Sequence, residues 1–265
     1  MEIVGYIAAL LIGLSLGLIG GGGSILTVPI LVYLFNVAPV LATSYSLFIV
    51  GTTSLVGSVA SFVDKKVALK TVLVFGTLSV ITVFCIRHYI IPHLPVVLNV
   101  FGYEMPVAVV TMLLFAFLMI GSSFFMIRNG ADLPTPGVQK GNFFKVSVYG
   151  IGVGLVTGLL GAGGGFLLIP ALTILMRLPI NTAIGTSLVI ITINSLIGFA
   201  DDITHHQMDW NLLLLVTAIS VAGVFLGSAI GKRIEGTILK KSFGWFVLLM
   251  GVYIIIHEVI EVINS

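Results

Sequence analysis

Two clusters of small residues offer the clearest chemistry in this sequence. They are Gly20, Gly21, Gly22, Gly23 and Ser24 in the first half, and Gly161, Ala162, Gly163, Gly164 and Gly165 in the second. Each cluster ends a long apolar segment and is followed at once by a short one. Glycine permits the positive backbone angles that interrupt a helix, and the first amide N–H groups of the next helix have no partner within it. Because helix N-termini carry about half a positive charge, the two breaks predict a binding site for an anion.

Hydroxyl-bearing residues in the third apolar segment of each half form a second set of candidates. We expect Ser46, Thr186 and Ser187 to line the path of the anion, because uncharged donors suit a solute that must be released as well as bound. Ser46 and Ser54 lie eight residues apart and therefore near one face of a helix. The alternative is that these hydroxyl groups hydrogen-bond to carbonyl groups of their own helix.

Ionisable residues within the apolar segments are scarce. Asp201 and Asp202 are our candidates for coupling transport to protons, since a proton-driven transporter usually keeps an ionisable residue in its pathway. The alternative is that both belong to a solvated loop. His205 and His206 lie close by, but adjacent histidines rarely converge on one metal ion. Because Cys85 is the single cysteine, a cysteine-based metal site is excluded. We expect no metal, no cofactor and no catalytic residue.

The elements that position these residues must be membrane helices. Of the 265 residues, 58% are hydrophobic and 8% are charged, whereas soluble domains carry about 25% charged residues. Apolar stretches long enough to cross a hydrocarbon layer of roughly 30 Å recur along the chain. The formal net charge of +2 is too small to indicate a nucleic-acid partner. We therefore predict an all-α polytopic integral membrane protein whose partners are the lipid bilayer and a small anion, with a homo-oligomer left open.

The chain contains an internal duplication. With a constant offset of 141 positions and no gap, residues 17–57 match residues 158–198 at 16 of 41 positions. The matches include Gly20 with Gly161, Pro29 with Pro170 and Ser46 with Ser187. Shared hydrophobicity would inflate matches of leucine, but not of glycine, proline and serine in this order. The two halves are therefore repeats of one structural unit.

Each repeat divides into five hydrophobic segments. They lie at about 3–20, 24–36, 40–62, 67–91 and 105–127, and at about 144–161, 166–176, 181–200, 210–231 and 242–261. We expect a first transmembrane repeat over 1–127, a cytoplasmic linker over 128–145 and a second transmembrane repeat over 146–265. The second segment of each repeat is shorter than the hydrocarbon layer is thick, and its length leaves open whether it crosses or re-enters.

The basic residues indicate how the segments cross. Cytoplasmic loops are enriched in Lys and Arg. If the first helix starts outside and each repeat crosses an odd number of times, every Lys and Arg except Arg87 falls on the cytoplasmic side. Either five crossings, or three crossings and a re-entrant hairpin, would satisfy this parity. Odd repeats in series are inverted relative to each other, an arrangement of secondary transporters that bind substrate near the midplane.

The two breaks also carry a resemblance to a known family. Residues 17–29 read GLIGGGGSILTVP, residues 158–170 read GLLGAGGGFLLIP, and residues 183–188 read AIGTSL. This pattern resembles the sulfite exporters of the TauE/SafE family, also called the 4-toluene sulfonate uptake permease family. The resemblance implies proton-coupled transport of small sulfur-containing oxyanions or organosulfonates, such as sulfite, thiosulfate or sulfoacetate. It also implies a bacterial or archaeal inner membrane, and about eight crossings in two repeats.

Two other functions compete with secondary transport. A passive anion channel or facilitator would show flux that does not respond to an imposed pH gradient. An intramembrane enzyme would need a serine and a histidine brought together within the membrane, whereas the histidines here lie near segment ends. We therefore expect a transporter rather than an enzyme.

Overall fold

The computed structural model describes residues 2–95, 97–100, 103–128, 143–161, 163–205, 207–231 and 236–264. Its first half contains α1 (Glu2–Ile19), η1 (Gly21–Leu26), α2 (Thr27–Phe35), α3 (Pro39–Val63), α4 (Leu69–Thr71), η2 (Val72–Gly76), α5 (Thr77–Cys85), η3 (Ile86–Ile90), η4 (Ile91–His93), β1 (Val97–Val100), β2 (Tyr103–Pro106) and α6 (Val107–Arg128). Its second half contains α7 (Phe143–Leu160), α8 (Gly165–Leu175), α9 (Ile180–Asp202), α10 (Trp210–Gly231) and α11 (Gly236–Asn264). The all-α prediction is confirmed, and each of the ten hydrophobic segments is helical.

Six spans among the described residues are long and apolar enough to cross a membrane. They are α3, the continuous span Leu69–His93 formed by α4 to η4, α6, α9, α10 and α11. Large apolar side chains such as Leu73, Phe117 and Leu249 are more than 60% exposed on the outside of the bundle. A soluble protein rarely exposes so many apolar side chains, and this surface suits contact with lipid. The chain is therefore a multi-pass membrane protein.

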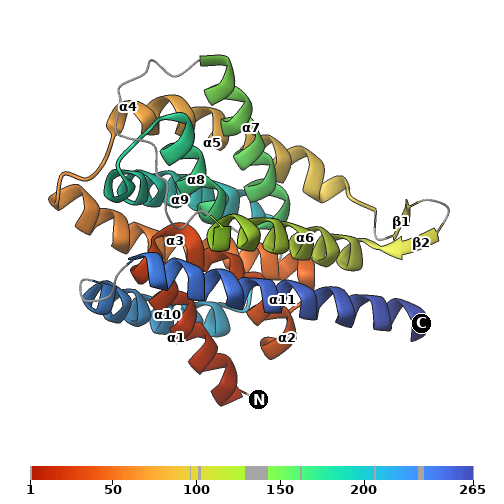
Figure 1. Ribbon diagram of the computed structural model, residues 1–265. Helices are drawn as coiled ribbons and strands as arrows, with labels where there is room; N and C mark the ends of the chain where they lie inside the picture. The colour runs from red at the N-terminus through yellow and green to blue at the C-terminus, as the bar shows by residue number, and fades with distance from the viewer. Residues whose placement is uncertain are drawn as a thin grey trace.

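The sequence reading did not anticipate the short antiparallel hairpin β1–β2. Val97 pairs with Pro106 and Val100 pairs with Tyr103, between η4 and α6. Figure 1 shows this hairpin and the C-terminus at one end of the bundle, with α4 at the other end. We call the hairpin end the outer end and the α4 end the inner end, following the distribution of basic residues.

The short helix α2 returns to the end of the bundle from which α1 came. A methyl group on Gly5 near the start of α1 would meet the ring of Phe35 at the end of α2. Gly23 at the break lies against Ser15 and Leu16 near the end of α1. The helices α1 and α2 are therefore antiparallel and form a hairpin with the glycine break at its tip. Two helices that both cross would also be antiparallel, so the depth of the tip decides between the two arrangements. Gly21 at the tip lies against Ile191, midway along α9, which favours three crossings and a re-entrant hairpin.

In each repeat, the first helix packs on a helix of the other repeat. α1 packs on α10, and its counterpart α7 packs on α5. Gly13 lies against Ser220 in the first of these contacts, and Gly154 lies against Ser79 in the second. Both residues of the second contact are related to those of the first by the offset of 141 positions. The same relation therefore extends from the glycine clusters to α5 and α10.

Corresponding helices of the two repeats also contact each other directly. Gly57 lies against Leu188, and Gly198 lies against Leu47, so α3 and α9 cross in opposite directions. The pair α6 and α11 is likewise antiparallel (Figure 1). The orientation of each repeat relative to the membrane stays a prediction, which this antiparallel packing supports. The division at 1–127, 128–145 and 146–265 also stays a prediction.

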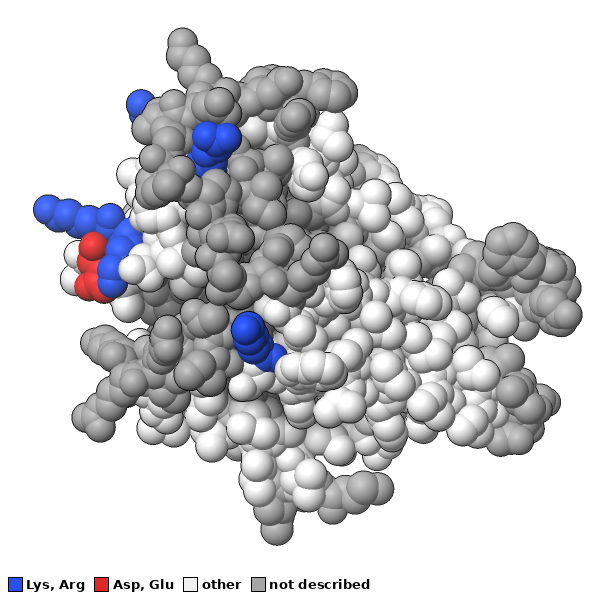
Figure 2. Space-filling view, viewed as in Figure 1, with Lys and Arg blue, Asp and Glu red and all other residues white. Residues whose placement is uncertain are grey.

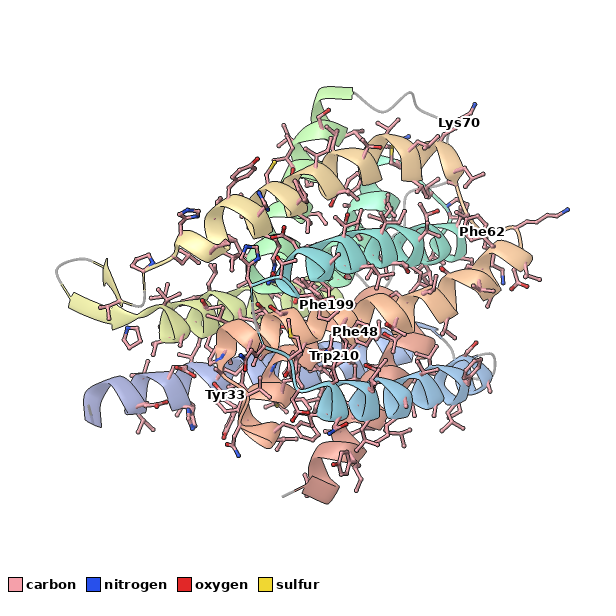
Figure 3. All side chains as sticks on the ribbon, turned by 180° about the vertical axis from the view of Figure 1, so that it is seen from behind. Tyr33, Phe48, Phe62, Lys70, Phe199 and Trp210 are labelled. Atoms are coloured by element: carbon pink, nitrogen blue, oxygen red, sulfur yellow. The ribbon has the colours of Figure 1, made fainter. Side chains whose placement is uncertain are left out.

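Charged side chains distinguish the two ends of the bundle, and an aromatic cluster joins three of its helices. In the view of Figure 2, Lys and Arg side chains gather toward the inner end, and the rest of the described surface is largely uncharged. Figure 3 shows Lys70 and Phe62 at that end. Phe48, Phe199 and Trp210 pack together where α3, α9 and α10 meet, with ring centroids 4.8 to 6.3 Å apart.

Candidate anion site at the glycine breaks

The tips of the two glycine breaks meet between the repeats. Gly21 at the start of η1 and Gly165 at the start of α8 touch backbone to backbone, so a methyl group on either would overlap the other. Both residues are buried. Gly161, Gly163 and Gly164 have φ values of 67°, 65° and 68°, a region that residues with a side chain rarely adopt. Glycine is thus required in the second break both by its backbone conformation and by the closeness of the first.

Gly20 and Ser24 of the first break are also buried. Gly20 has a φ of 75° and lies against Ile184, while Gly22 belongs to the short helix η1. Ser24 is fully buried, and its hydroxyl donates to the Gly21 carbonyl at 2.8 Å. The Ser24 hydroxyl therefore satisfies a carbonyl of the break. Ala162 in the second break lies outside the described residues.

Several buried hydroxyl groups near the breaks have no hydrogen-bond partner. The Ser195 hydroxyl lies 3.2 Å from where a methyl group on Gly163 would stand, and the Thr157 hydroxyl faces Gly164. Among the described residues, the buried hydroxyl oxygens without a partner are those of Thr27, Ser46, Ser54, Thr157 and Ser195. A buried polar group without a partner costs about 1–3 kcal/mol, so the Ser195 and Thr157 hydroxyls beside the second break are candidates to bind a ligand.

A cavity of about 280 Å³ adjoins the first break from the inner end. Residues of both repeats line it: Leu16, Gly17, Leu18, Gly20, Thr53, Val56, Gly57, Ala60, Ser61, Asp64, Lys66, Asn181, Ile184, Leu188, Val224, Phe225 and Ser228. We call it the Gly20 cavity. Lys66 bonds to Asp64 at 2.6 Å among these residues, so the ammonium charge is matched by a carboxylate. Hydroxyl and amide groups are the other polar groups that the cavity offers an anion.

The hydroxyl candidates of the third segments differ in whether they are free to bind. Ser46 is fully buried and its hydroxyl has no partner. The Ser187 hydroxyl instead donates to the Ile184 carbonyl of its own helix at 2.8 Å. The Thr186 hydroxyl accepts a hydrogen bond from the Ala68 amide at 3.0 Å. A role for these three residues in the path stays a prediction, for which Ser46 is the best placed.

Asp202 forms a buried ion pair. Its carboxylate accepts a hydrogen bond from the Arg87 guanidinium at 2.7 Å, with side-chain exposures of 3% and 0%. Arg87 also donates to Thr43 at 3.2 Å and to Ser44 at 3.4 Å. A solvated loop therefore does not describe Asp202. Arg87, the one basic residue that the predicted topology did not place on the cytoplasmic side, lies inside the protein.

Asp201 has a more accessible environment than its neighbour. His88 lies 2.9 Å from one Asp201 oxygen, and the His88 side chain is 42% exposed. His205 lies 4.0 Å from the other oxygen. Proton coupling by Asp201 or Asp202 stays a prediction. His206 lies outside the described residues.

Sequence reasoning missed Arg87 as a site residue, although a signal was available. Arg87 lies within the apolar segment 67–91, and a charged residue inside such a segment usually faces the protein interior and has a function. The π-helical turn η3 that contains Arg87 is a second sign, because such turns are frequent at functional sites. No sequence pattern would have joined Arg87 to Asp202, which is 115 residues away.

A second polar cluster lies at the outer end of α2 and α11. Glu258 is 5% exposed and accepts a hydrogen bond from the Tyr33 hydroxyl at 2.7 Å. Ligand atoms of His257, Glu258 and Glu261 lie within 4.8 Å of one another, a spacing that a metal ion would allow. Exposed acidic groups often gather without an ion. The hydrogen bond from Tyr33 to Glu258 joins α2 to α11, so the cluster contributes a contact between these two helices.

Comparison with known proteins places the chain in a family. The sequence model of the sulfite exporter TauE/SafE family matches residues 6–254, nearly the whole chain. The chain belongs to this family. The TauE/SafE family consists of membrane transporters rather than enzymes, which agrees with the six apolar spans.

Relatives from bacteria and archaea carry transporter names. A “Probable membrane transporter protein” of Xylella fastidiosa (strain 9a5c) is 28% identical over 92% of this chain and 91% of its own length. The protein YdhB of Bacillus subtilis, with the same description, is 23% identical over 88% and 91%. A relative in Methanocaldococcus jannaschii is 34% identical over 40% and 42%. No solved structure matches the chain significantly. This TauE/SafE protein is thus a multi-pass transporter of the cell membrane.

Proposed function

We propose that this protein is a secondary transporter of small sulfur-containing oxyanions or organosulfonates, coupled to protons. The observation that carries the proposal is the meeting of the two glycine breaks beside buried hydroxyl groups without partners. The first amide groups of η1 and α8 lack partners within their helices, and a bound anion would satisfy them together with the Ser195 and Thr157 hydroxyls. The substrate is therefore held by neutral donors between the repeats.

The size and setting of the Gly20 cavity support a small substrate. Its volume of about 280 Å³ is near the lower limit of ligand pockets, which occupy about 300–1,000 Å³. The cavity reaches Gly20 from the inner end, where the basic residues lie (Figure 2). It ends at Gly20, next to Gly21 of the proposed site, and so supports access from one side of the membrane, as a transporter that exposes its site to one side at a time requires.

The substrate class is tested by binding and by flux. Purified protein is screened by thermal shift against sulfite, thiosulfate, sulfoacetate and a set of carboxylates. We expect the sulfur anions to stabilise the protein and the carboxylates to have little effect. Uptake of sulfoacetate into proteoliposomes is then measured with and without an imposed pH gradient. Flux that ignores the gradient would identify a passive anion channel and contradict proton coupling.

The site itself is tested by removing one hydroxyl group. Ser195→Ala should reduce sulfoacetate uptake about tenfold or more, because the Ser195 hydroxyl has no hydrogen-bond partner in the protein and would bind the anion. Ser123→Ala is the matched control: Ser123 is equally buried, but its hydroxyl bonds to the Ile120 carbonyl of its own helix. Gly163→Leu should abolish uptake, since at a φ of 65° its side chain is strained, overlaps Val50 and approaches the Ser195 hydroxyl. Wild-type uptake by both Ser195→Ala and Gly163→Leu would overturn the proposed site.

A further inference from the structure

The Gly20 cavity has a counterpart in the other repeat that is closed. The offset of 141 positions relates Gly20 to Gly161, Ser61 to Asp202, and Ser228 to Arg87. Ser61 and Ser228 line the open cavity, whereas Asp202 and Arg87 form the buried ion pair. The same place in the two repeats is therefore an open space in one and a charged contact in the other.

Packing around the ion pair supports this correspondence. Gly161 lies against Thr43, just as Gly20 lies against Ile184, and the offset relates Thr43 to Ile184. A methyl group on Gly198 would stand 3.8 Å from the Arg87 side chain, and its counterpart Gly57 borders the Gly20 cavity. The ion pair thus occupies the region through which the tip of the second break would otherwise be reached.

The two places lie at opposite ends of the same helix. Ser61 near the end of α3 borders the Gly20 cavity, and Thr43 near its start binds Arg87. Eighteen residues of α-helix separate them by about 27 Å, close to the thickness of the hydrocarbon layer. One place therefore faces the inner end of the bundle and the other faces the outer end, where β1 and β2 lie (Figure 1).

We propose that the Arg87–Asp202 ion pair is the outer gate of the transport pathway, closed here while the Gly20 cavity forms the open inner route. The proposal rests on the proposed function as a transporter. Because the two repeats share one fold, each can adopt the conformation that the other has here. The closed repeat would then open while the open repeat closes. Separation of Arg87 from Asp202 would then open an outer cavity at Gly161 while the inner cavity closes.

The chemistry of the pair suits a gate. Removing one partner of a buried ion pair leaves an uncompensated charge at a cost of about 3–5 kcal/mol, so a pair stabilises the closed arrangement strongly. Arg87 keeps one further donor, its Nε–H group, without a partner. The counterpart residues Ser61 and Ser228 are uncharged and form no ion pair. The inner end is therefore open at the Gly20 cavity, while the outer end is closed by Arg87 and Asp202.

The gate is tested with a pair of cysteine reporters related by the same offset. In a Cys85→Ala background, Leu47→Cys places a thiol beside Gly198, which also borders the Arg87 side chain, and Leu188→Cys places one in the Gly20 cavity. A membrane-impermeant methanethiosulfonate is applied to the outer or the inner face of vesicles. We expect Leu188→Cys to react from the inner face and Leu47→Cys to be protected from the outer face.

Weakening the pair should reverse this pattern. Asp202→Asn should raise outer-face labelling of Leu47→Cys at least tenfold and lower inner-face labelling of Leu188→Cys. The control Asp209→Asn removes an exposed carboxylate at the same end, where Asn can still cap α10, and should leave Leu47→Cys protected. The charge-swapped variant Arg87→Asp with Asp202→Arg keeps an ion pair and should restore protection, even if Asp202→Asn alone folds poorly.

Each result separates the gate from the proposed function. Protection of Leu47→Cys in Asp202→Asn, with Leu188→Cys still reactive, would overturn the gate and leave the inner route standing. So would free labelling of Leu47→Cys in the charge-swapped variant. Absence of inner-face labelling at Leu188→Cys in the unaltered pair would instead count against the Gly20 cavity as a route, and so against the proposed function.

Discussion

The contact between the two break tips gives a quantitative prediction. Gly165 is buried, and a methyl group at this position would overlap the carbonyl group and Cα of Gly21. The φ of Gly165 is not in the positive range, so alanine is compatible with its backbone and Gly165→Ala tests the contact alone. The matched control is Gly152→Ala in α7, because no heavy atom lies within 4 Å of its added methyl group.

The magnitude follows from two opposing terms. Alanine in place of glycine at a compatible backbone stabilises the fold by roughly 0.4–1 kcal/mol because it restricts the unfolded chain, and this term applies to both variants. Overpacking costs about 1–3 kcal/mol and applies only to Gly165→Ala. The two variants should therefore differ by about 1–3 kcal/mol in free energy of unfolding, with Gly152→Ala as stable as wild type or more so.

Unfolding in mild detergent micelles and sulfoacetate uptake into proteoliposomes measure the two consequences. We expect Gly165→Ala to lower the unfolding free energy, because the added methyl group forces the two break tips apart. We also expect uptake to fall at least tenfold, because the tips form the proposed site. Gly152→Ala should transport as wild type does. Equal stability and equal uptake in the two variants would refute the reasoning, since it would mean that the tips do not pack as closely as the structure indicates.

Two further contacts yield predictions of stability. Tyr33→Phe should lower the free energy of unfolding by about 1.5–3 kcal/mol, because it leaves the buried Glu258 carboxylate without its donor; thermal unfolding in micelles measures this, and an unchanged midpoint would show that water replaces the hydroxyl. Gly13→Ala should destabilise the packing of α1 on α10 by about 1–3 kcal/mol, since its methyl group would meet the Ser220 backbone. Gly121→Ala has open space and is the control, so equal loss in both variants would contradict a packing role.

Much of the fold followed from the sequence because membrane helices leave strong local signals. Apolar length alone located all ten segments, with bounds close to those of the helices. The offset of 141 positions identified the repeats, and it also relates contacts that the sequence could not show, such as Gly13 with Ser220 and Gly154 with Ser79. The small β1–β2 hairpin was missed because its strands are only four residues long.

Some features of the candidate site also followed from the sequence, and others did not. The sequence by itself determined where the helices break, because positive backbone angles at Gly20 and Gly161 depend on the absence of a local side chain. Only the tertiary structure decided that the break tips meet at Gly21 and Gly165 and that Arg87 reaches Asp202. Both contacts join residues more than 100 positions apart, and the packing of whole helices sets them, so no local pattern of residues encodes them.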